Sequence, residues 1–174
     1  MSEAEIGQIV DGILAAWNDR DMSRLLSYLA PGVVWDDPAM LDGPVEGHEG
    51  VRAFGESIFQ AFPDFAYRIR EPICVAESGT RCAIPWEIRA THTGRFGPLG
   101  LSPTGRVVRI RGVDVLEFES GKVTRIETLF NVVPALEQVL GLKPLSESRL
   151  ARIVAVALQR CRAGWLRLTA KARQ

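Results

Sequence analysis

Apolar residues recur at helical spacing in the first part of the chain, which predicts amphipathic helices there. Ser2 and Glu5 can form a capping box that begins the first helix. Its apolar positions are Ile6, Ile9, Val10, Ile13, Leu14 and Trp17. Asp21 can cap a second, short helix, which Pro31-Gly32 ends. The apolar positions of this second helix are Leu25, Leu26 and Leu29.

A strand and a third helix follow. The β-branched pair Val33-Val34 leads through Trp35 into Asp37-Pro38 and predicts a strand that ends at this proline. Residues 40–47 are rich in glycine, proline and acids, which is typical of a loop. The third helix is expected to stop at Pro63. Its apolar positions are Val51, Phe54, Ile58, Phe59 and Phe62.

From Asp64 to Leu129 the apolar period changes to two, which predicts a meander of four antiparallel strands. Turn signals separate the strands at 77–79, 94–105 and 119–121. Pro85 lies inside the second strand and indicates a bulge or an edge position, because proline cannot donate to the ladder. Helices followed by a bent antiparallel sheet predict an α+β domain in which the helices cover one face of the sheet and a pocket is left between them.

Alternate residues of a strand share a face, so one polar residue among apolar ones marks the inner wall of that pocket. On the inner face of the third strand the one polar residue is Asp114, and on the inner face of the second strand it is His92. Thr128 lies on the inner face of the last strand, and Asn131 follows that strand, so both are expected at the pocket mouth, where they would bind the substrate oxygen. The apolar and aromatic residues expected to bind a substrate are Trp35, Tyr67, Trp86, Ile88, Leu116 and Phe130.

These polar residues suit acid–base chemistry. A carboxyl group in an apolar wall is costly to ionise, so Asp114 is expected to stay protonated and to donate a hydrogen bond to a substrate oxygen. Asp37, held extended before Pro38, is the candidate base, and His92 could polarise the same oxygen. Structural roles remain open: Asp114 could anchor a backbone amide, Asp37 could form a turn, and His92 could be a core histidine.

Composition narrows the partners. The 174 residues carry 21 basic and 21 acidic residues, so no overall charge attracts nucleic acid. The N-terminal residues are acidic and no apolar run approaches about 20 residues, so we expect a cytoplasmic protein without a transmembrane segment. Two histidines without a shared spacing predict no metal site. The cysteines are expected to be free, buried thiols; they are Cys74, Cys82 and Cys161.

Residues 1–143 are expected to form the pocket domain, and residues 144–174 to add an amphipathic helix with a basic face. Seven basic residues stand against Glu147 in this last segment. The basic face could be solvated while the helix packs on the acidic body or on a second subunit. Alternatively, it could contact a membrane surface or an acidic partner protein.

Several segments together resemble the nuclear transport factor 2-like superfamily over about residues 5–142, and this resemblance implies a cone-shaped fold. The segments 34–38 and 112–118 resemble two strands of the ketosteroid isomerases. This resemblance implies that Asp37 is the proton-shuttling base and Asp114 the protonated acid of an oxyanion hole. Longer stretches resemble the SnoaL-like polyketide cyclases, in which a histidine at the place of His92 assists ring closure. Those stretches are 61–64, 90–94, 103–106 and 138–142.

The chain departs from each relative at one position. The cyclases usually carry an acid on the strand after Gly121-Lys122, where this chain has Thr128 and, three residues further, Asn131. Threonine cannot shuttle a proton at neutral pH as a carboxylate can. The oxyanion-hole tyrosine of the ketosteroid isomerases is replaced by Ile13. Relatives of limonene epoxide hydrolase carry an arginine where this chain has Gly112, which weakens an epoxide-hydrolase assignment.

The resulting expectation is an isomerase or cyclase without a cofactor, acting on a small, apolar, ketone-bearing polyketide, steroid or terpenoid. A non-catalytic protein that binds small molecules or serves as a dimeric scaffold is the alternative from another class, and epoxide ring opening is a further one. A homodimer is expected through the outer face of the sheet, which carries Arg109, Arg111 and Val113.

Overall fold

The computed structural model describes residues 1–142. The chain divides into two compact units, Met1–Leu140 and Gly141–Gln174, and the first carries every described helix and strand. The helix expected over residues 144–174 and the thiol of Cys161 lie outside the described residues. Within the first unit, helices and a mostly antiparallel sheet confirm the α+β fold class.

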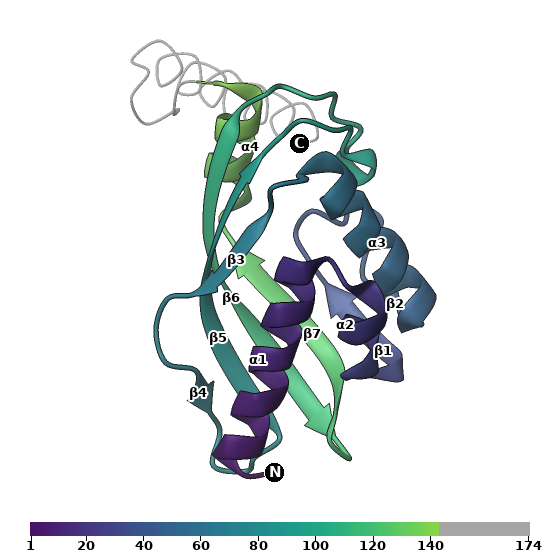
Figure 1. Ribbon diagram of the computed structural model, residues 1–174, viewed down its shortest axis with the longest axis vertical. Coiled ribbons are helices and arrows are strands. Elements are labelled where there is room, and N and C mark those ends of the chain that lie inside the picture. The colour runs from purple at the N-terminus through teal and green to yellow at the C-terminus, as the bar shows by residue number, and fades with distance from the viewer. Residues whose placement is uncertain (143–174) are drawn as a thin grey trace, which may run out of the picture. The chain divides into compact units, whose positions relative to one another are not determined.

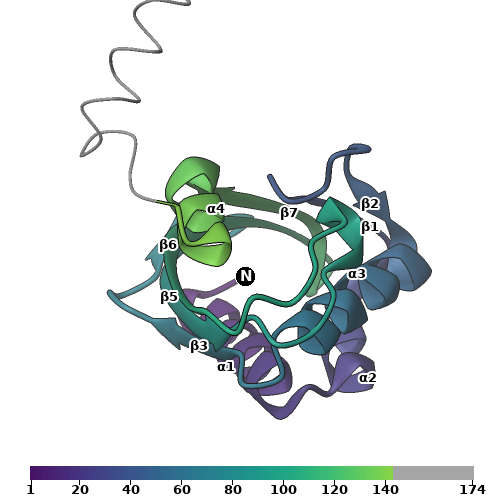
Figure 2. The ribbon, with the colours of Figure 1, turned by 90° about the horizontal axis from the view of Figure 1, so that it is seen from above.

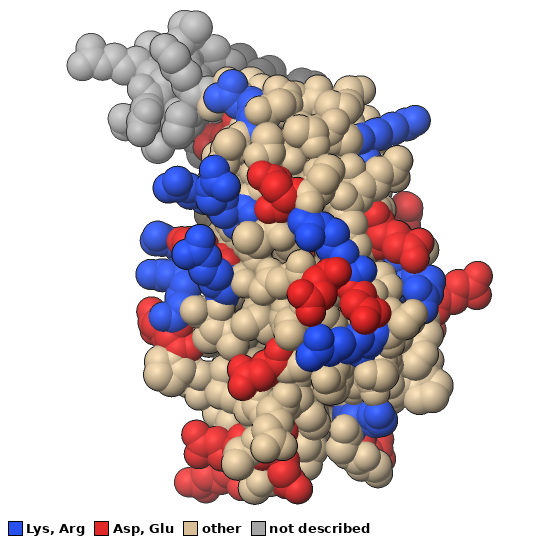
Figure 3. All heavy atoms as spheres, in the orientation of Figure 1, with Lys and Arg blue, Asp and Glu red and all other residues tan. Residues whose placement is uncertain are grey.

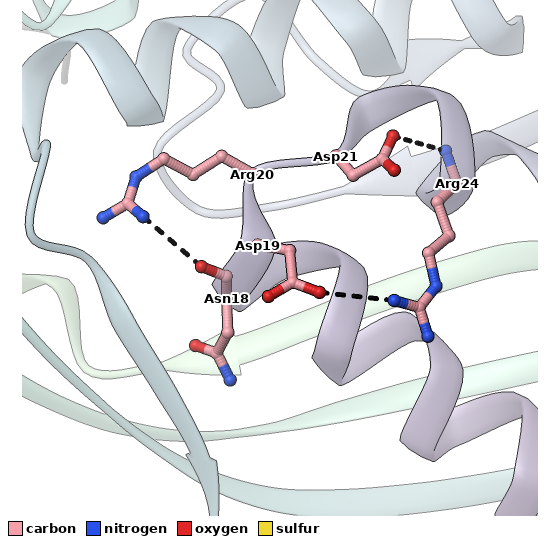
Figure 4. Close-up of polar contacts among 5 residues, drawn as sticks. All are labelled: Asn18, Asp19, Arg20, Asp21 and Arg24. Carbon is pink, nitrogen blue, oxygen red and sulfur yellow. Dashed lines mark hydrogen bonds and ion pairs between the residues drawn. The ribbon is translucent and has the colours of Figure 1, made fainter.

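The first two helices begin where their capping residues predict. The helix α1 (Glu3–Asp19) starts at Ser2, whose hydroxyl accepts the Glu5 amide while the Glu5 carboxylate accepts the Ser2 amide. The helix α2 (Met22–Ser27) starts at Asp21, whose Oδ1 accepts the Arg24 amide at 2.9 Å. Figure 4 shows Arg24 reaching back to Asp19 at 3.2 Å. These contacts fix the turn between the two helices.

The end of the second helix was predicted wrongly. Leu29 already belongs to the strand β1 (Leu29–Asp36), and Pro31-Gly32 lies inside that strand rather than at a helix end. The reason is an interruption in the pairing of β1, whose register shifts between Leu29 and Val34. Pro31 falls in this interruption, where its missing N–H costs no ladder hydrogen bond.

Seven strands form one sheet in the order β2-β1-β7-β6-β5-β3, with β4 also paired to β5. Only β1 and β7 pair in parallel. The expected first strand of the meander is split into two short strands on either side of a gap. Pro85 lies opposite this gap, so it interrupts no pairing on that side. The bounds are β2 (Val45–Glu46), β3 (Ala66–Ile69), β4 (Cys74–Val75), β5 (Arg81–Thr91), β6 (Val107–Glu119) and β7 (Lys122–Phe130).

Helices close the open side of the curved sheet. Figure 2 shows α3 (Gly47–Ala61) across the interior from β5 and β6, while α1 lies beside β3 and α4 (Val132–Leu140) lies near one end of β6 (see also Figure 1). The side chain of Gln138 holds α4 there, because it bonds both the amide (2.8 Å) and the carbonyl (3.0 Å) of Arg109. Sequence reasoning missed α4, and it also missed β2, which lies inside the expected loop 40–47.

The surface of this unit carries both charges. Figure 3 shows basic and acidic side chains interspersed over the face drawn there. None of the described helices is long and apolar enough to cross a membrane. Cys82 is buried and free, as expected, whereas Cys74 is free but exposed because it lies on the short outer strand β4.

The loop between β5 and β6 is fixed to the end of α3 by a close backbone approach at Gly94. The Gly94 amide donates to the Ala61 carbonyl at 3.0 Å. A Cβ at Gly94 would overlap the Gln60 carbonyl oxygen and lie 2.8 Å from its carbon. At Gly97, in the same loop, an added Cβ would meet nothing within 4 Å.

We therefore expect Gly94→Ala to lower the free energy of unfolding by about 1–3 kcal/mol, the usual cost of overpacking. Gly97→Ala is the matched control and should change it by less than about 1 kcal/mol. Urea denaturation followed by circular dichroism measures both. Equal effects of the two substitutions would contradict the close approach at Gly94.

Candidate functional site

A cavity of about 140 Å³ lies between the sheet and the helices of the first unit. Nine aromatic side chains are part of its wall, and they come from helices, strands and loops alike. Apart from Trp N–H groups, the polar side chains of the lining are Asp37, Tyr67, Asp114 and Thr128. The aromatic residues are Trp17, Trp35, Phe54, Phe62, Phe65, Tyr67, Trp86, Phe96 and Phe130.

Most of the predicted site residues meet at this cavity. The two candidate acids line it together with Thr128 and with the predicted binding residues Trp35, Tyr67, Trp86, Ile88 and Phe130. Leu116 instead lines a smaller, deeper cavity of about 30 Å³. Asp114 and Tyr67 line both cavities and thus lie between them.

Asp37 is a buried carboxyl at the end of β1, with 8% of its surface exposed. Its Oδ1 accepts the Ala39 amide at 2.7 Å, so the residue forms the turn that its position before Pro38 allows. Burial raises the pKa of Asp37 from 3.8 to about 7; the Ala39 hydrogen bond opposes this rise, and the charge of Asp114 adds to it. The turn and a role as a base are therefore compatible.

Asp114 lies in the middle of β6, directly across from Thr128 of β7. The Tyr67 hydroxyl donates to its Oδ2 at 2.8 Å. Burial raises the pKa of Asp114; the hydrogen bond from Tyr67 opposes this rise most, and the donor groups of Trp86 and Thr128 oppose it further. Burial also raises the pKa of Tyr67 well above its usual value, and the charge of Asp114 adds to that rise. The phenol and the carboxyl group therefore form a pair that holds protons strongly.

Two further contacts fix the position of this pair. The Asn18 side chain, at the end of α1, bonds both the amide (2.8 Å) and the carbonyl (3.0 Å) of Tyr67. On the opposite side, Trp35 Nε1 donates to the Thr128 hydroxyl at 3.0 Å. Asn18 was not predicted as part of the site, because its partner lies 49 residues away in the chain.

His92 does not line the cavity, contrary to its expected place in the wall. It is fully buried behind Phe62, with ring centroids 5.1 Å apart, and its Nδ1 lies 3.2 Å from the Thr104 hydroxyl. Burial lowers the pKa of His92, and the Gly94 backbone opposes this shift. Its backbone also bonds Gly105 and Arg106. The geometry is that of a core histidine that closes the base of the loop between β5 and β6.

Asn131 is not at the mouth of the main cavity either. It lies on a surface depression beside Arg109, and its Oδ1 accepts the Val133 amide at 3.2 Å at the start of α4. This helix contributes lining residues that were not predicted, although their spacing of three and four residues was a readable helical signal. They are Val132, Ala135, Leu136 and Val139.

The arrangement can carry out proton transfer. The lining combines one acid with a pKa near neutrality and a second whose pKa is also raised by burial, inside an apolar chamber. Among residues 1–142, no three His, Cys, Asp or Glu side chains are grouped so that they could hold a metal ion.

The raised pKa of Asp37 predicts a dependence of stability on pH. The folded chain keeps a proton on Asp37 between about pH 4 and 7 that the unfolded chain releases, so unfolding becomes easier as the pH rises through this range. Asp37→Asn keeps the acceptor oxygen for Ala39 but cannot ionise. We expect it to be more stable than the parent above pH 7, by on the order of a few kcal/mol.

Denaturation in urea at pH 5 and pH 8 measures this difference. Asp36→Asn, one residue earlier in β1, is the control for the loss of a negative charge at this place. A stability gain for Asp37→Asn that is no larger at pH 8 than at pH 5 would argue against a buried, protonated Asp37.

Comparison with known proteins agrees with this fold. A family profile described as the SnoaL-like domain matches residues 10–126. AclR from Streptomyces galilaeus, a "putative hydroxylase", is 30% identical, with 82% of this chain and all of that chain covered, and a TM-score of 0.68. TsrD from Streptomyces laurentii is 22% identical, with 82% of this chain and 99% of that chain covered, and a TM-score of 0.69.

A "putative polyketide cyclase" from Pseudomonas putida shares the fold at 20% identity, with 75% of this chain and 95% of that chain covered and a TM-score of 0.64. No curated protein matches the sequence. The family match spans well over half of the chain and agrees with the resemblance in its sequence segments. The chain therefore belongs to the SnoaL-like domain family of the nuclear transport factor 2-like fold.

Proposed function

We propose that the protein is an acid–base enzyme that moves a proton on a small, apolar ketone. Asp37 is the base, and the Tyr67–Asp114 pair is the donor that stabilises the enolate oxygen. The observation that carries this proposal is the shared cavity, in which burial raises the pKa values of both carboxyl groups. A base works best when its pKa lies near the working pH, which is where Asp37 titrates.

The proposed reaction has two proton transfers. The ketone oxygen accepts a hydrogen bond from the Tyr67–Asp114 pair while Asp37 removes the proton from the α-carbon. The electron pair of the broken C–H bond moves into the enolate, whose negative charge lies on the oxygen that faces the donors. Asp37 then returns the proton, either to a different carbon of an unsaturated ketone or after the enolate carbon has attacked a second carbonyl.

Thr128 supports this arrangement without transferring a proton itself. Its hydroxyl is occupied by the Trp35 N–H and lies across the strand pair from Asp114. The position that carries an acid in typical relatives therefore serves here to hold Trp35 and Asp114. For this reason we favour isomerisation of the ketone over the aldol ring closure of typical relatives.

The cavity limits what reacts inside it. An apolar protein cavity of about 150 Å³ holds one benzene ring. The cavity of about 140 Å³ thus suits a substrate that places one six-membered ring between the two acids. The aromatic wall favours a planar or partly unsaturated ring, because stacked and edge-on contacts stabilise it.

Isomerisation of 3-cyclohexen-1-one to the conjugated 2-cyclohexen-1-one tests the proposal with a one-ring probe, and ultraviolet absorbance follows the product. We expect the parent chain to accelerate the reaction over buffer. Asp37→Asn should lower the rate by about 10²–10⁴-fold, because it removes the base. Asp114→Ala should also lower it, because the enolate loses its donor.

Asp36→Asn is the matched control and should keep the parent rate. Phenol, which resembles the enol, should bind to the parent and quench tryptophan fluorescence. Binding of phenol without any acceleration of the isomerisation would instead indicate a small-molecule-binding protein of this fold. Full activity of Asp37→Asn would rule out the assigned base.

A further inference from the structure

Two polar atoms beside the proposed site are buried and have no hydrogen-bond partner among the described residues. They are Trp86 Nε1, a donor, and Asp114 Oδ1, an acceptor. A buried polar group without a partner is costly, so native structures rarely leave one unsatisfied. A donor and an acceptor left over in the same wall can satisfy each other.

The strand register brings the two side chains together. Trp86 of β5 pairs with Gly112 of β6, and Asp114 lies two residues further along the same face of β6. Diagonal neighbours of this kind are within reach of a long aromatic side chain. Trp86 also contacts the ring of Tyr67, with centroids 5.9 Å apart, and Tyr67 already donates to the other oxygen of Asp114.

Gly112 determines where the indole ring lies. A Cβ at this position would lie 2.7 Å from Trp86 Cη2, closer still to Cζ2, and 2.6 Å from the Leu129 carbonyl oxygen of the neighbouring strand. The atoms Cζ2 and Nε1 are bonded to the same ring carbon of the indole. The edge of the ring that carries the N–H therefore lies close to Gly112. A side chain at position 112 would push this edge off the strand.

We propose that Trp86 is a positioning residue that donates its indole N–H to Asp114 Oδ1, and that Gly112 is required because only a bare backbone lets the ring lie there. Tyr67 then fixes one oxygen of the carboxyl group and Trp86 the other. The effect on turnover rests on the proposed function, but the hydrogen bond itself does not.

The electrostatics agree with this arrangement. The indole N–H of Trp86 opposes the rise that burial causes in the pKa of Asp114. The other ionisable groups that face Asp114 are Asp37 at the end of β1, Tyr67 on β3 and Cys82 on β5. Trp86 is thus a neutral donor in a wall that contains no described basic side chain. It donates to the carboxyl group without adding a positive charge.

The hydrogen bond can be tested by nuclear magnetic resonance on the full chain labelled with ¹⁵N. The indole signal of Trp86 is the one that Trp86→Phe removes. We expect Asp114→Ala to move this signal upfield, because its proton loses an acceptor. The Trp35 indole, which donates to Thr128, is the internal reference for a bonded N–H. A Trp86 signal that does not respond to Asp114→Ala would overturn the proposal.

The pH profile of 3-cyclohexen-1-one isomerisation tests the effect on the proposed reaction. Trp86→Phe should lower turnover by about 10- to 100-fold, as expected for one hydrogen bond to an ionisable group. It should also move the limb that reports Asp114 to higher pH, because the carboxyl group loses a donor, and leave the limb near pH 7, which reports Asp37. A merely structural role would lower turnover at every pH without moving either limb.

Gly112→Ala should reproduce the upfield shift of the Trp86 signal and the loss of turnover, because the ring is displaced. Gly32→Ala is the matched control, since a Cβ on that strand residue meets nothing within 4 Å. If Gly112→Ala does not fold, Trp86→Phe and Asp114→Ala decide the question alone. If the parent chain does not accelerate the isomerisation but Asp114→Ala still moves the Trp86 indole signal, the proposed reaction is rejected and the hydrogen bond is kept.

Discussion

The free-energy cost of placing carboxyl groups in an aromatic chamber governs the properties of this site. An ionised carboxylate loses its hydration when it is buried, so the protonated form is favoured until hydrogen bonds or opposite charges compensate. Asp37 receives one amide hydrogen bond and titrates near neutrality. Asp114 receives a phenol hydroxyl and its pKa also remains raised. Two side chains of the same chemical type thereby become suited to different tasks.

The sheet topology brings these two carboxyl groups to one cavity. Asp37 follows β1, which pairs with β7 in parallel, and β7 pairs with β6, which carries Asp114. The intervening strand contributes Thr128, which bonds Trp35 from β1. A curved sheet turns these neighbouring inner faces toward each other, and aromatic residues of α1, α3 and the loops line the space between them. The low polarity of the chamber is therefore a property of the whole fold.

Two residues described for related proteins are replaced in this chain, and the structure shows what surrounds each replacement. Ile13 replaces the tyrosine of α1, but Tyr67 supplies a phenol from β3 and Asn18 holds its backbone in place. Thr128 replaces an acid, and its hydroxyl, too weakly acidic to shuttle a proton, accepts the Trp35 N–H instead. The two departures noted in the sequence thus have structural counterparts, and both leave Asp37 and Asp114 as the acidic groups of the chamber.

Local periodicity determined the helices α1 and α3, the meander and the inward face of β6, because a repeat of 3.6 or 2 residues is visible in a short segment. A lone Asp114 among apolar neighbours was readable for the same reason. Only the tertiary structure decided that Asn18 clamps Tyr67, that Trp86 lies over Gly112, and that His92 is placed behind Phe62 rather than in the cavity wall. These features depend on contacts between residues far apart in the chain, and no periodicity within one element records which distant side chain it will meet.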